Sequence, residues 1–258
     1  MSILKVTSLC KNFGGLSAIV NVDIEIEKGE LIGLIGPNGA GKTTLFNLLT
    51  GVYVASSGSV EFTPDDKVEN LIGLKPYQIT KLGTARTFQN IRLFKEMTVL
   101  ENVKVAMNKD IKYSIMSAIL RLPKFYRVED EVHQKALELL KLVGLIDKQA
   151  ELAKNLPYGE QRKLEIARAL ATNPKLLYLD EPAAGMNPQE TKELTDLIKI
   201  VKDKYDLTIL LIEHDMSLVM KICERIYVLD YGMCIASGTP LEIRNNPRVI
   251  EAYLGEEV

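Results

Sequence analysis

The first third of the chain alternates between strand patterns and turn residues. Apolar and charged side chains alternate over residues 22–26, as in a half-buried strand, and the continuous apolar run 31–35 indicates a strand buried on both faces. A glycine-rich stretch follows, and a helix is predicted over about 42–50 because Gly51 can end it as a C-cap. The polar stretch 52–75 contains turn signals and predicts a small antiparallel segment.

The middle of the chain has a helical periodicity, from about residue 98 to residue 145. Apolar side chains recur there on one helical stripe that ends at Gly144. The stripe comprises Ala136, Leu137, Leu140 and Val143. The apolar stretch 111–122 is only about a dozen residues long, too short for a membrane span, so we interpret it as core or subunit contact.

Strand and helix patterns alternate again after Pro157. The expected elements are a helix over 159–171, strands over 176–180 and 208–212, and a hairpin over 225–237 around Tyr231-Gly232. Asn187 and Pro188 have the residue types of a helix N-cap and first position, and Asp215 is placed to cap a further helix. The first of these helices has a buried stripe of Leu194, Leu197, Ile198 and Val201. This alternation predicts a parallel sheet covered on both sides, with ligands at the carboxyl ends of its strands.

Composition and charge exclude several classes of protein. The chain has 258 residues, of which 47% are hydrophobic and 26% charged, which is an ordinary globular composition for one or two domains. A formal net charge of -2 provides no field that would hold the chain on nucleic acid or an anionic bilayer by charge alone. Lysines interrupt the apolar positions near the N-terminus, so we expect no signal peptide. The three scattered cysteines, Cys10, Cys223 and Cys234, are expected to be small buried hydrophobes of a reduced, cytoplasmic compartment.

A glycine-rich loop between the strand over 31–35 and the following helix fits the P-loop pattern. The loop reads Gly36-Pro37-Asn38-Gly39-Ala40-Gly41-Lys42-Thr43. Its glycines let successive backbone amides point into one anion-sized hollow in front of the helix N-terminus. Lys42 can reach the outer phosphates and the Thr43 hydroxyl can ligate Mg²⁺. A glycine-rich turn opening an ordinary helix is the alternative, but the strand–loop–helix context favours a nucleoside triphosphate site.

Two carboxylates follow the buried strand over 176–180. Adjacent strand residues point to opposite sides, so Asp180 and Glu181 are expected to have different roles. Asp180 can approach Mg²⁺ through its water shell. Glu181, which Pro182 is expected to hold extended, would project past the strand end and polarise an attacking water. A pair of exposed acids at a strand end remains the alternative.

One of the two histidines follows the next strand. If that strand is parallel to its neighbours, His214 lies at the same edge of the sheet as the phosphates. A histidine at a strand end is more often a structural hydrogen-bonder. A γ-phosphate beside it would reverse that interpretation.

The order of these motifs resembles the nucleotide-binding subunit of an ABC transporter over nearly the whole chain. The resemblance implies that Phe13 stacks on adenine, and that Thr44 joins residues 36–43 in binding the nucleotide. It also implies that Gln89 is the Q-loop glutamine, a Mg²⁺ ligand and sensor, and that His214 is the switch histidine. Catalysis would then rest on Glu181, His214 and Gln89, and the metal would be held by Thr43, Gln89 and Asp180.

The signature motif and the D-loop depart from the family pattern. Leu156, Pro157, Tyr158, Gly159 and Glu160 match the signature, which would act in trans on the ATP of a partner subunit. Pro157 stands where a serine normally offers a hydroxyl and a backbone N–H, and it offers neither. Tyr158 replaces the first signature glycine, which leaves Gly159 and the following helix N-terminus as anion donors. In the D-loop over 184–187, Asn187 replaces the usual aspartate and keeps a hydrogen-bonding side chain.

The resemblance implies a fold and a division of the chain. The fold is an α/β P-loop NTPase core with a mostly parallel sheet, a small antiparallel β subdomain and an inserted helical subdomain. The ATP-binding core would comprise 1–92 and 162–258, and the helical subdomain 93–161, together one transporter domain over about 3–255. The altered signature, the stretch 85–94 and the ending 249–255 are similar to the LivG-type ATPases of branched-chain amino-acid importers.

The implied function is that of an ATP-hydrolysing motor for solute uptake, with ATP and Mg²⁺ bound between two head-to-tail subunits. The partners would be a second ATP-binding subunit, identical or related, two transmembrane permease subunits and, indirectly, a solute-binding protein. The chain would then be cytoplasmic and peripheral on the inner face of the membrane. Alternatives are the ATPase of another ABC transporter (urea, amide or lipid-related), a soluble ABC ATPase of DNA repair or translation, and a nucleotide-binding protein without turnover. The soluble class would show a coiled-coil insertion, paired cassettes or a basic face, and we find none in the sequence.

Overall fold

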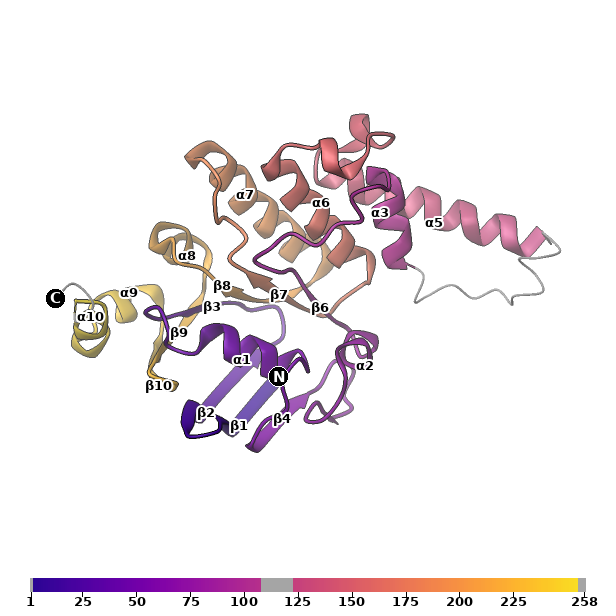
Figure 1. Cartoon of the computed structure of the whole chain (residues 1–258). Helices are drawn as coiled ribbons and strands as arrows, with labels where there is room; N and C mark the ends of the chain where they lie inside the picture. Colours follow the sequence, from indigo (N-terminus) through magenta and orange to yellow (C-terminus); the bar gives the residue numbers. More distant parts are fainter. Residues whose placement is uncertain (1, 108–122, 255–258) are drawn as a thin grey trace. The chain divides into compact units, whose positions relative to one another are not determined.

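A computed structural model describes residues 2–107 and 123–254, which divide into two compact units (Figure 1). We call residues 1–89 and 175–258 the core unit, and residues 90–174 the helical unit. The stretch 111–122, expected to be core or subunit contact, lies outside the described residues. The expected subdomain boundary at 161 falls inside a helix that belongs wholly to the helical unit, and the division into functional subdomains stays a prediction.

The core unit contains a mixed sheet of six strands in the order β10-β9-β3-β8-β7-β6. The strands are β3 (Leu31–Ile35), β6 (Thr84–Arg86), β7 (Leu176–Asp180), β8 (Thr208–Ile212), β9 (Arg225–Asp230) and β10 (Met233–Gly238). All neighbours are parallel except the β9–β10 hairpin. Every residue of β3, β7 and β8 is buried, as their continuous apolar runs predict. The predicted mostly parallel sheet is therefore confirmed, and the carboxyl ends of β3, β7 and β8 lie at one edge.

A second, antiparallel sheet has the order β2-β1-β4-β5. Its strands are β1 (Ser2–Phe13), β2 (Leu16–Glu27), β4 (Ser57–Phe62) and β5 (Glu69–Asn70). The two short strands lie in the polar stretch predicted to form an antiparallel segment, but they add to two N-terminal strands of 12 residues each. This sheet is therefore larger than the sequence pattern indicated.

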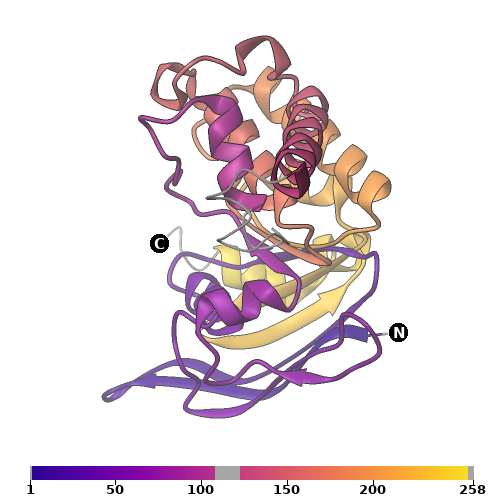
Figure 2. The ribbon, with the colours of Figure 1, turned by 90° about the vertical axis from the view of Figure 1, so that its right-hand side faces the viewer.

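The main hydrophobic core of the core unit lies between the two sheets, around helix α1 (Lys42–Leu49) (Figure 2). Leu45, Phe46 and Leu49 of α1 are fully buried there against side chains of both sheets. The ring of Phe46 meets that of Tyr178 on β7 edge to face, with 5.5 Å between centroids. This packing fixes the helix that follows the predicted P-loop.

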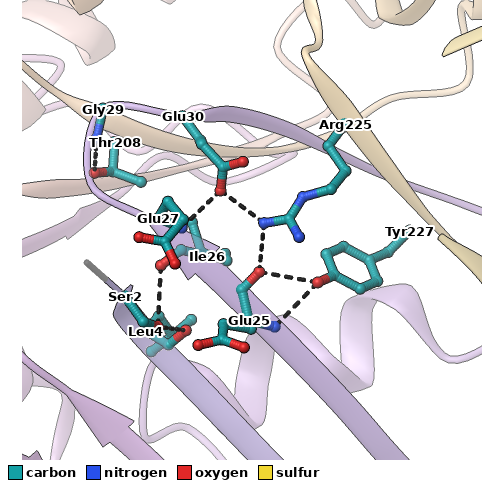
Figure 3. Close-up of polar contacts among 10 residues, drawn as sticks. All are labelled: Ser2, Leu4, Glu25, Ile26, Glu27, Gly29, Glu30, Thr208, Arg225 and Tyr227. Atoms are coloured by element: carbon teal, nitrogen blue, oxygen red, sulfur yellow. Dashed lines mark hydrogen bonds and ion pairs between the residues drawn. The ribbon is translucent and has the colours of Figure 1, made fainter. Parts of the chain in front are cut away.

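Polar contacts join the antiparallel sheet to the mixed sheet at one end (Figure 3). A guanidinium nitrogen of Arg225 on β9 donates to the backbone carbonyl of Glu25 on β2 and to the carboxylate of Glu30, both over 2.7 Å. The hydroxyl of Tyr227 donates to the same Glu25 carbonyl over 2.9 Å. The amide of Gly29 donates to the Thr208 hydroxyl over 3.0 Å. These contacts fix the position of the antiparallel sheet against the mixed sheet at this end.

The remaining helices of the core unit are α2 (Pro76–Lys81), α7 (Pro188–Tyr205), α8 (Met216–Ile222), α9 (Pro240–Arg244) and α10 (Pro247–Leu254). Figure 1 shows α7 and α8 on the face of the mixed sheet opposite α1. The side chain of Asn187 accepts the amide of Glu190, and that of Asp215 accepts the amide of Ser217, so both predicted N-caps are confirmed. All four residues of the predicted α7 stripe are buried. No described helix is both long and apolar enough to cross a membrane.

The described part of the helical unit contains α3 (Val99–Ala106), α5 (Pro123–Leu142), α6 (Tyr158–Ala171) and the 3₁₀ turns η2 (Ile146–Lys148) and η3 (Ala153–Asn155). The buried stripe of α5 continues into the turn after it and comprises Ala136, Leu139, Leu140 and Val143. The predicted stripe was wrong at Leu137, which is half-buried. The spacing i, i+3, i+4 and i+7 places Leu139, not Leu137, on the face between Ala136 and Val143.

The three cysteines are all free. Only Cys223 is buried, whereas Cys10 and Cys234 are partly exposed, so the expectation of three buried hydrophobes was wrong for two of them. Cys10 lies on β1 and Cys234 on β10. Both strands are only partly buried, and the pairing of each contains register shifts.

Candidate functional site

The predicted P-loop lies between β3 and α1, where its sequence placed it. Two positions of the loop can be occupied only by glycine. A Cβ on Gly36, whose φ is 151°, would lie 2.1 Å from the carbonyl oxygen of Leu229. A Cβ on Gly41, whose φ is 103°, would lie 2.9 Å from the carbonyl oxygen of Ala18. The loop therefore folds tightly against β9 and β2 only because these positions lack side chains.

The loop encloses a buried cation. The Lys42 side chain belongs to a residue only 6% exposed, and its ammonium donates to the carbonyls of Gly36 (2.6 Å) and Pro37 (2.7 Å). Thr43 is exposed in the first turn of α1, and Thr44 is half-buried beside it. Asn38 and Gly39 at the tip of the loop are exposed, while Ala40 is buried. A buried ammonium at the positive end of a helix dipole suits a polyphosphate.

Asp180 ends β7 at the same sheet edge. Its Oδ2 accepts a guanidinium N–H of Arg86 over 2.6 Å, and the two side chains are 6% and 8% exposed. Sequence analysis missed Arg86. The sequence around it has no apolar strand pattern, since β6 reads Thr84-Ala85-Arg86, and only the structure shows that this buried guanidinium has an acidic partner.

Glu181 was expected to be extended before Pro182, and this was wrong. Its φ is 47°, in the left-handed region. The chain turns sharply here, because the Glu181 amide still donates to the carbonyl of Ile212 on β8 (2.9 Å) while its carbonyl accepts the Ala184 amide (3.2 Å). This turn overrides the extended preference that a following proline imposes.

The turn brings together the three residues predicted to be catalytic. The side-chain amide of Gln89 donates to Oε2 of Glu181 over 2.7 Å. Nε2 of His214 lies 2.8 Å from Oε1 of the same carboxylate. The Glu181 side chain is 13% exposed and that of His214 46%. One carboxylate is thus held between the segments that follow β6 and β8.

A second buried carboxylate, which sequence analysis missed, lies beneath this group. Glu213 is 4% exposed, and its two oxygens accept the amides of Ala183 (2.7 Å) and His214 (3.1 Å). Burial raises the pKa of Glu213 above its ordinary value, although backbone amides oppose the shift, and the nearby charge of Glu181 adds a smaller rise. Glu213 therefore ties the loop after β7 to the loop after β8. An acidic residue directly after an apolar strand was the only signal in the sequence.

Phe13 ends β1 and is 42% exposed. Its ring meets Tyr53 edge to face, with 5.2 Å between centroids, and the Lys11 ammonium lies 4.8 Å from its centroid. The partly open ring offers a surface on which a flat base can stack.

The predicted signature residues lie at the start of α6 in the helical unit. Pro157 occupies the N-cap position without a side-chain cap, and Gly159 is buried in the first turn. Tyr158 is 44% exposed, and its hydroxyl accepts a guanidinium N–H of Arg162 over 3.2 Å. Leu156 is buried. The carboxylate of Glu160 accepts the Lys148 ammonium over 2.7 Å, so it is already paired within this unit.

In the described part of the chain, no cluster of three or more His, Cys, Asp and Glu side chains forms a metal cage. Mg²⁺ does not need such a cage, because it usually keeps several waters and is shared between one or two carboxylates and substrate phosphates. Thr43, Asp180 and Gln89 have side-chain oxygens of the kind that such a shared site uses.

A P-loop joined to a parallel sheet, with an inserted helical unit, defines an ATP-binding cassette, and the comparisons agree. Residues 19–184 match the family model described as ABC transporter, and the chain belongs to this family. Residues 234–258 match a second model, described as branched-chain amino acid ATP-binding cassette transporter.

Named relatives cover nearly the whole chain. It is 50% identical over 254 residues, 98% of each chain, to the high-affinity branched-chain amino acid transport ATP-binding protein LivG of Escherichia coli (strain K12). It is 46% identical, with the same coverage, to the protein BraF of Pseudomonas aeruginosa, whose name is otherwise the same. A solved ATP-binding cassette of an ABC transporter in its ADP conformation has a TM-score of 0.84 and 33% identity over 99% of both chains.

Proposed function

We propose that this chain is the ATP-hydrolysing motor subunit of an ABC importer for branched-chain amino acids. Its membership of the ABC transporter family supports the motor. The LivG and BraF relatives, whose names specify branched-chain amino acid transport, support the solute, as does the match of residues 234–258. We further propose that MgATP binds between two head-to-tail ATP-binding subunits, which work with two permease subunits at the inner face of the membrane and, indirectly, with a solute-binding protein.

In this proposal the P-loop and Phe13 bind the substrate. The backbone amides of residues 36–44, except that of Pro37, which has no N–H, bind the phosphates together with the Lys42 ammonium, and the Phe13 ring stacks on adenine. Mg²⁺, when bound, neutralises charge on the β- and γ-phosphates. Thr43, Gln89 and the water shell around Asp180 would hold it.

Glu181 is the proposed base. It orients the attacking water and accepts its proton, while His214 contacts the γ-phosphate. The observation that carries this assignment is the shared carboxylate: Gln89 and His214 both contact Glu181, at 2.7 Å and 2.8 Å. A carboxylate held from two sides keeps its orientation without being locked away from solvent, since it remains 13% exposed.

The signature segment at the start of α6 would complete the partner subunit's site. The N-terminus of this 14-residue helix offers backbone donors and a positive dipole to the partner's γ-phosphate. Leu156, Tyr158, Gly159 and Glu160 would form this surface. The serine contact of the usual signature is replaced by these backbone groups, because Pro157 has no donor.

The test is ATP turnover by the assembled complex carrying Glu181→Gln. We expect phosphate release to fall by at least about 100-fold, because the substitution keeps shape but removes the base. ATP binding should be retained. The matched control is Glu61→Gln on β4, outside the site, which should release phosphate at the wild-type rate. Near-normal turnover in Glu181→Gln would remove Glu181 from this role.

A further inference from the structure

Arg86 connects three elements of the core unit at the predicted magnesium edge. One guanidinium nitrogen donates to Oδ2 of Asp180 on β7 over 2.6 Å. The other donates to Oδ1 of Asn47 (2.8 Å) and to the Thr50 hydroxyl (2.9 Å), at the end of the P-loop helix α1. Arg86 itself ends β6, three residues before Gln89. One side chain therefore joins the P-loop helix, the acidic strand and the segment leading to Gln89.

Two aromatic rings contact the Arg86 guanidinium in addition to its hydrogen-bond partners. Its central carbon lies 5.5 Å from the ring centroid of Phe46 and 5.0 Å from that of Phe88. The Arg86 side chain is 8% exposed. A planar, delocalised cation stacked and hydrogen-bonded in this manner has little rotational freedom, so its Asp180 partner is oriented equally firmly.

The pairing leaves the two oxygens of Asp180 in different situations. Oδ2 accepts a hydrogen bond from Arg86, and this ion pair does not use the acceptor capacity of Oδ1. Groups that hydrogen-bond to a metal-directed carboxylate orient it and tune its affinity, and their loss typically weakens metal binding 10- to 100-fold.

We propose that Arg86 is a positioning residue that orients the Asp180 carboxylate toward Mg²⁺ and so sets the metal dependence of nucleotide binding. This inference rests on the proposed role of Asp180 in the MgATP site. The competing explanation is a purely structural role for Arg86, as a buried cation that connects three elements. The two explanations differ in their predictions for loss of Arg86. A positioning role lowers the affinity for nucleotide mainly when Mg²⁺ is present, whereas a purely structural role lowers the affinity equally with and without Mg²⁺.

The experiment measures equilibrium binding of a fluorescent ATP analogue to the full chain, first in EDTA and then across a Mg²⁺ titration. In Arg86→Met, the Mg²⁺ concentration at the midpoint should rise about 10- to 100-fold, while affinity in EDTA should change by less than about twofold. Arg86→Lys keeps the charge but cannot reach Asp180 and Asn47 together, so it should show a smaller rise in the same direction. Arg225→Met is the matched control, because Arg225 also forms an ion pair between elements of this unit, away from the site.

Several outcomes would overturn the inference. They are an unchanged midpoint in Arg86→Met, equal weakening with and without Mg²⁺, or an equal shift in Arg225→Met. If Arg86→Met does not fold, Arg86→Lys decides, and an unchanged midpoint there refutes the positioning role. Wild-type binding that is indifferent to Mg²⁺ would overturn the proposed metal role and this inference together. A wild type that depends on Mg²⁺ with unshifted variants would overturn this inference alone.

Discussion

The ion pair inside α6 predicts a large stability effect from a single substitution. Arg162 is fully buried, and its guanidinium donates to the carboxylate of Glu165 over 2.7 Å, with the two side chains 0% and 6% exposed. Arg162→Met keeps much of the volume but removes the ion-pair partner of a buried carboxylate, so that Arg168 becomes the remaining cation near Glu165. Removing one partner of a buried pair costs about 3–5 kcal/mol of unfolding free energy, and the charge of Arg168 places the expected loss at the lower end of that range. The lost contact to the Tyr158 hydroxyl adds little, because that residue is 44% exposed and water can replace the bond.

The double variant Arg162→Met/Glu165→Leu separates the charge effect from packing. Replacing both partners with apolar side chains is often neutral or stabilising, so the double variant should recover most of the loss and lie within about 2 kcal/mol of wild type. Urea unfolding followed by circular dichroism gives both free energies. Amide hydrogen exchange in α6 places the loss in the helical unit, which matters because two units need not unfold together. A single variant that loses less than about 1 kcal/mol, or a double variant as unstable as the single, would refute the reasoning.

Two further predictions concern buried titratable groups. Burial raises the folded-state pKa of Glu213, so its favourable contribution to the free energy of unfolding is fully present below the unfolded-state pKa and is lost as pH rises through the folded-state pKa. In Glu213→Gln the fall in stability above about pH 4.5 should therefore be flatter, which thermal unfolding across pH measures. An unaltered pH slope in Glu213→Gln would contradict this. Burial raises the pKa of the Cys223 thiol to about 12, so about one in ten thousand molecules carries the Cys223 thiolate at pH 8. An aromatic disulfide reagent should therefore modify Cys10 well before Cys223 in the native chain, with Cys223→Ser as the assignment control. Faster labelling of Cys223 than of Cys10 would contradict this prediction.

The sequence predicted best those elements whose local pattern and tertiary environment agree. The strands over 31–35, 176–180 and 208–212 are apolar throughout because both faces are covered, and each was found with its bounds. No strand was predicted over β1. Its pairing with β2 and β4 contains several register shifts, and Ser8 has a φ of 47°, so the alternation of apolar and polar positions is broken.

The candidate site divides in the same way. The P-loop could be predicted because spacing and backbone conformation alone form it, and Gly36 and Gly41 show why those residue types are needed. The meeting of the segments after β7 and β8 followed from the rule that parallel strands end at one edge. Arg86 had no local signal, and Glu213 had only that of an acidic residue directly after an apolar strand. Their partners, Asp180 and the Ala183 amide, are 94 and 30 positions away in the chain, so the pattern around each residue does not indicate the contact.

Each carboxylate at this edge is shared between two segments, and this limits how the site can move. Arg86 joins Asp180 to α1, Glu181 is held by Gln89 and His214, and Glu213 joins the loops after β7 and β8. A displacement of the segment carrying Gln89 therefore removes a contact from Glu181, the proposed base, and a displacement of β6 acts on Asp180 through Arg86. Packed, hydrogen-bonded networks change between discrete arrangements and deform little within one. Movement of the segment between β6 and the helical unit would thus change the proposed base, Glu181, and the proposed metal carboxylate, Asp180, together, which is the property that a motor needs if hydrolysis is to follow closure.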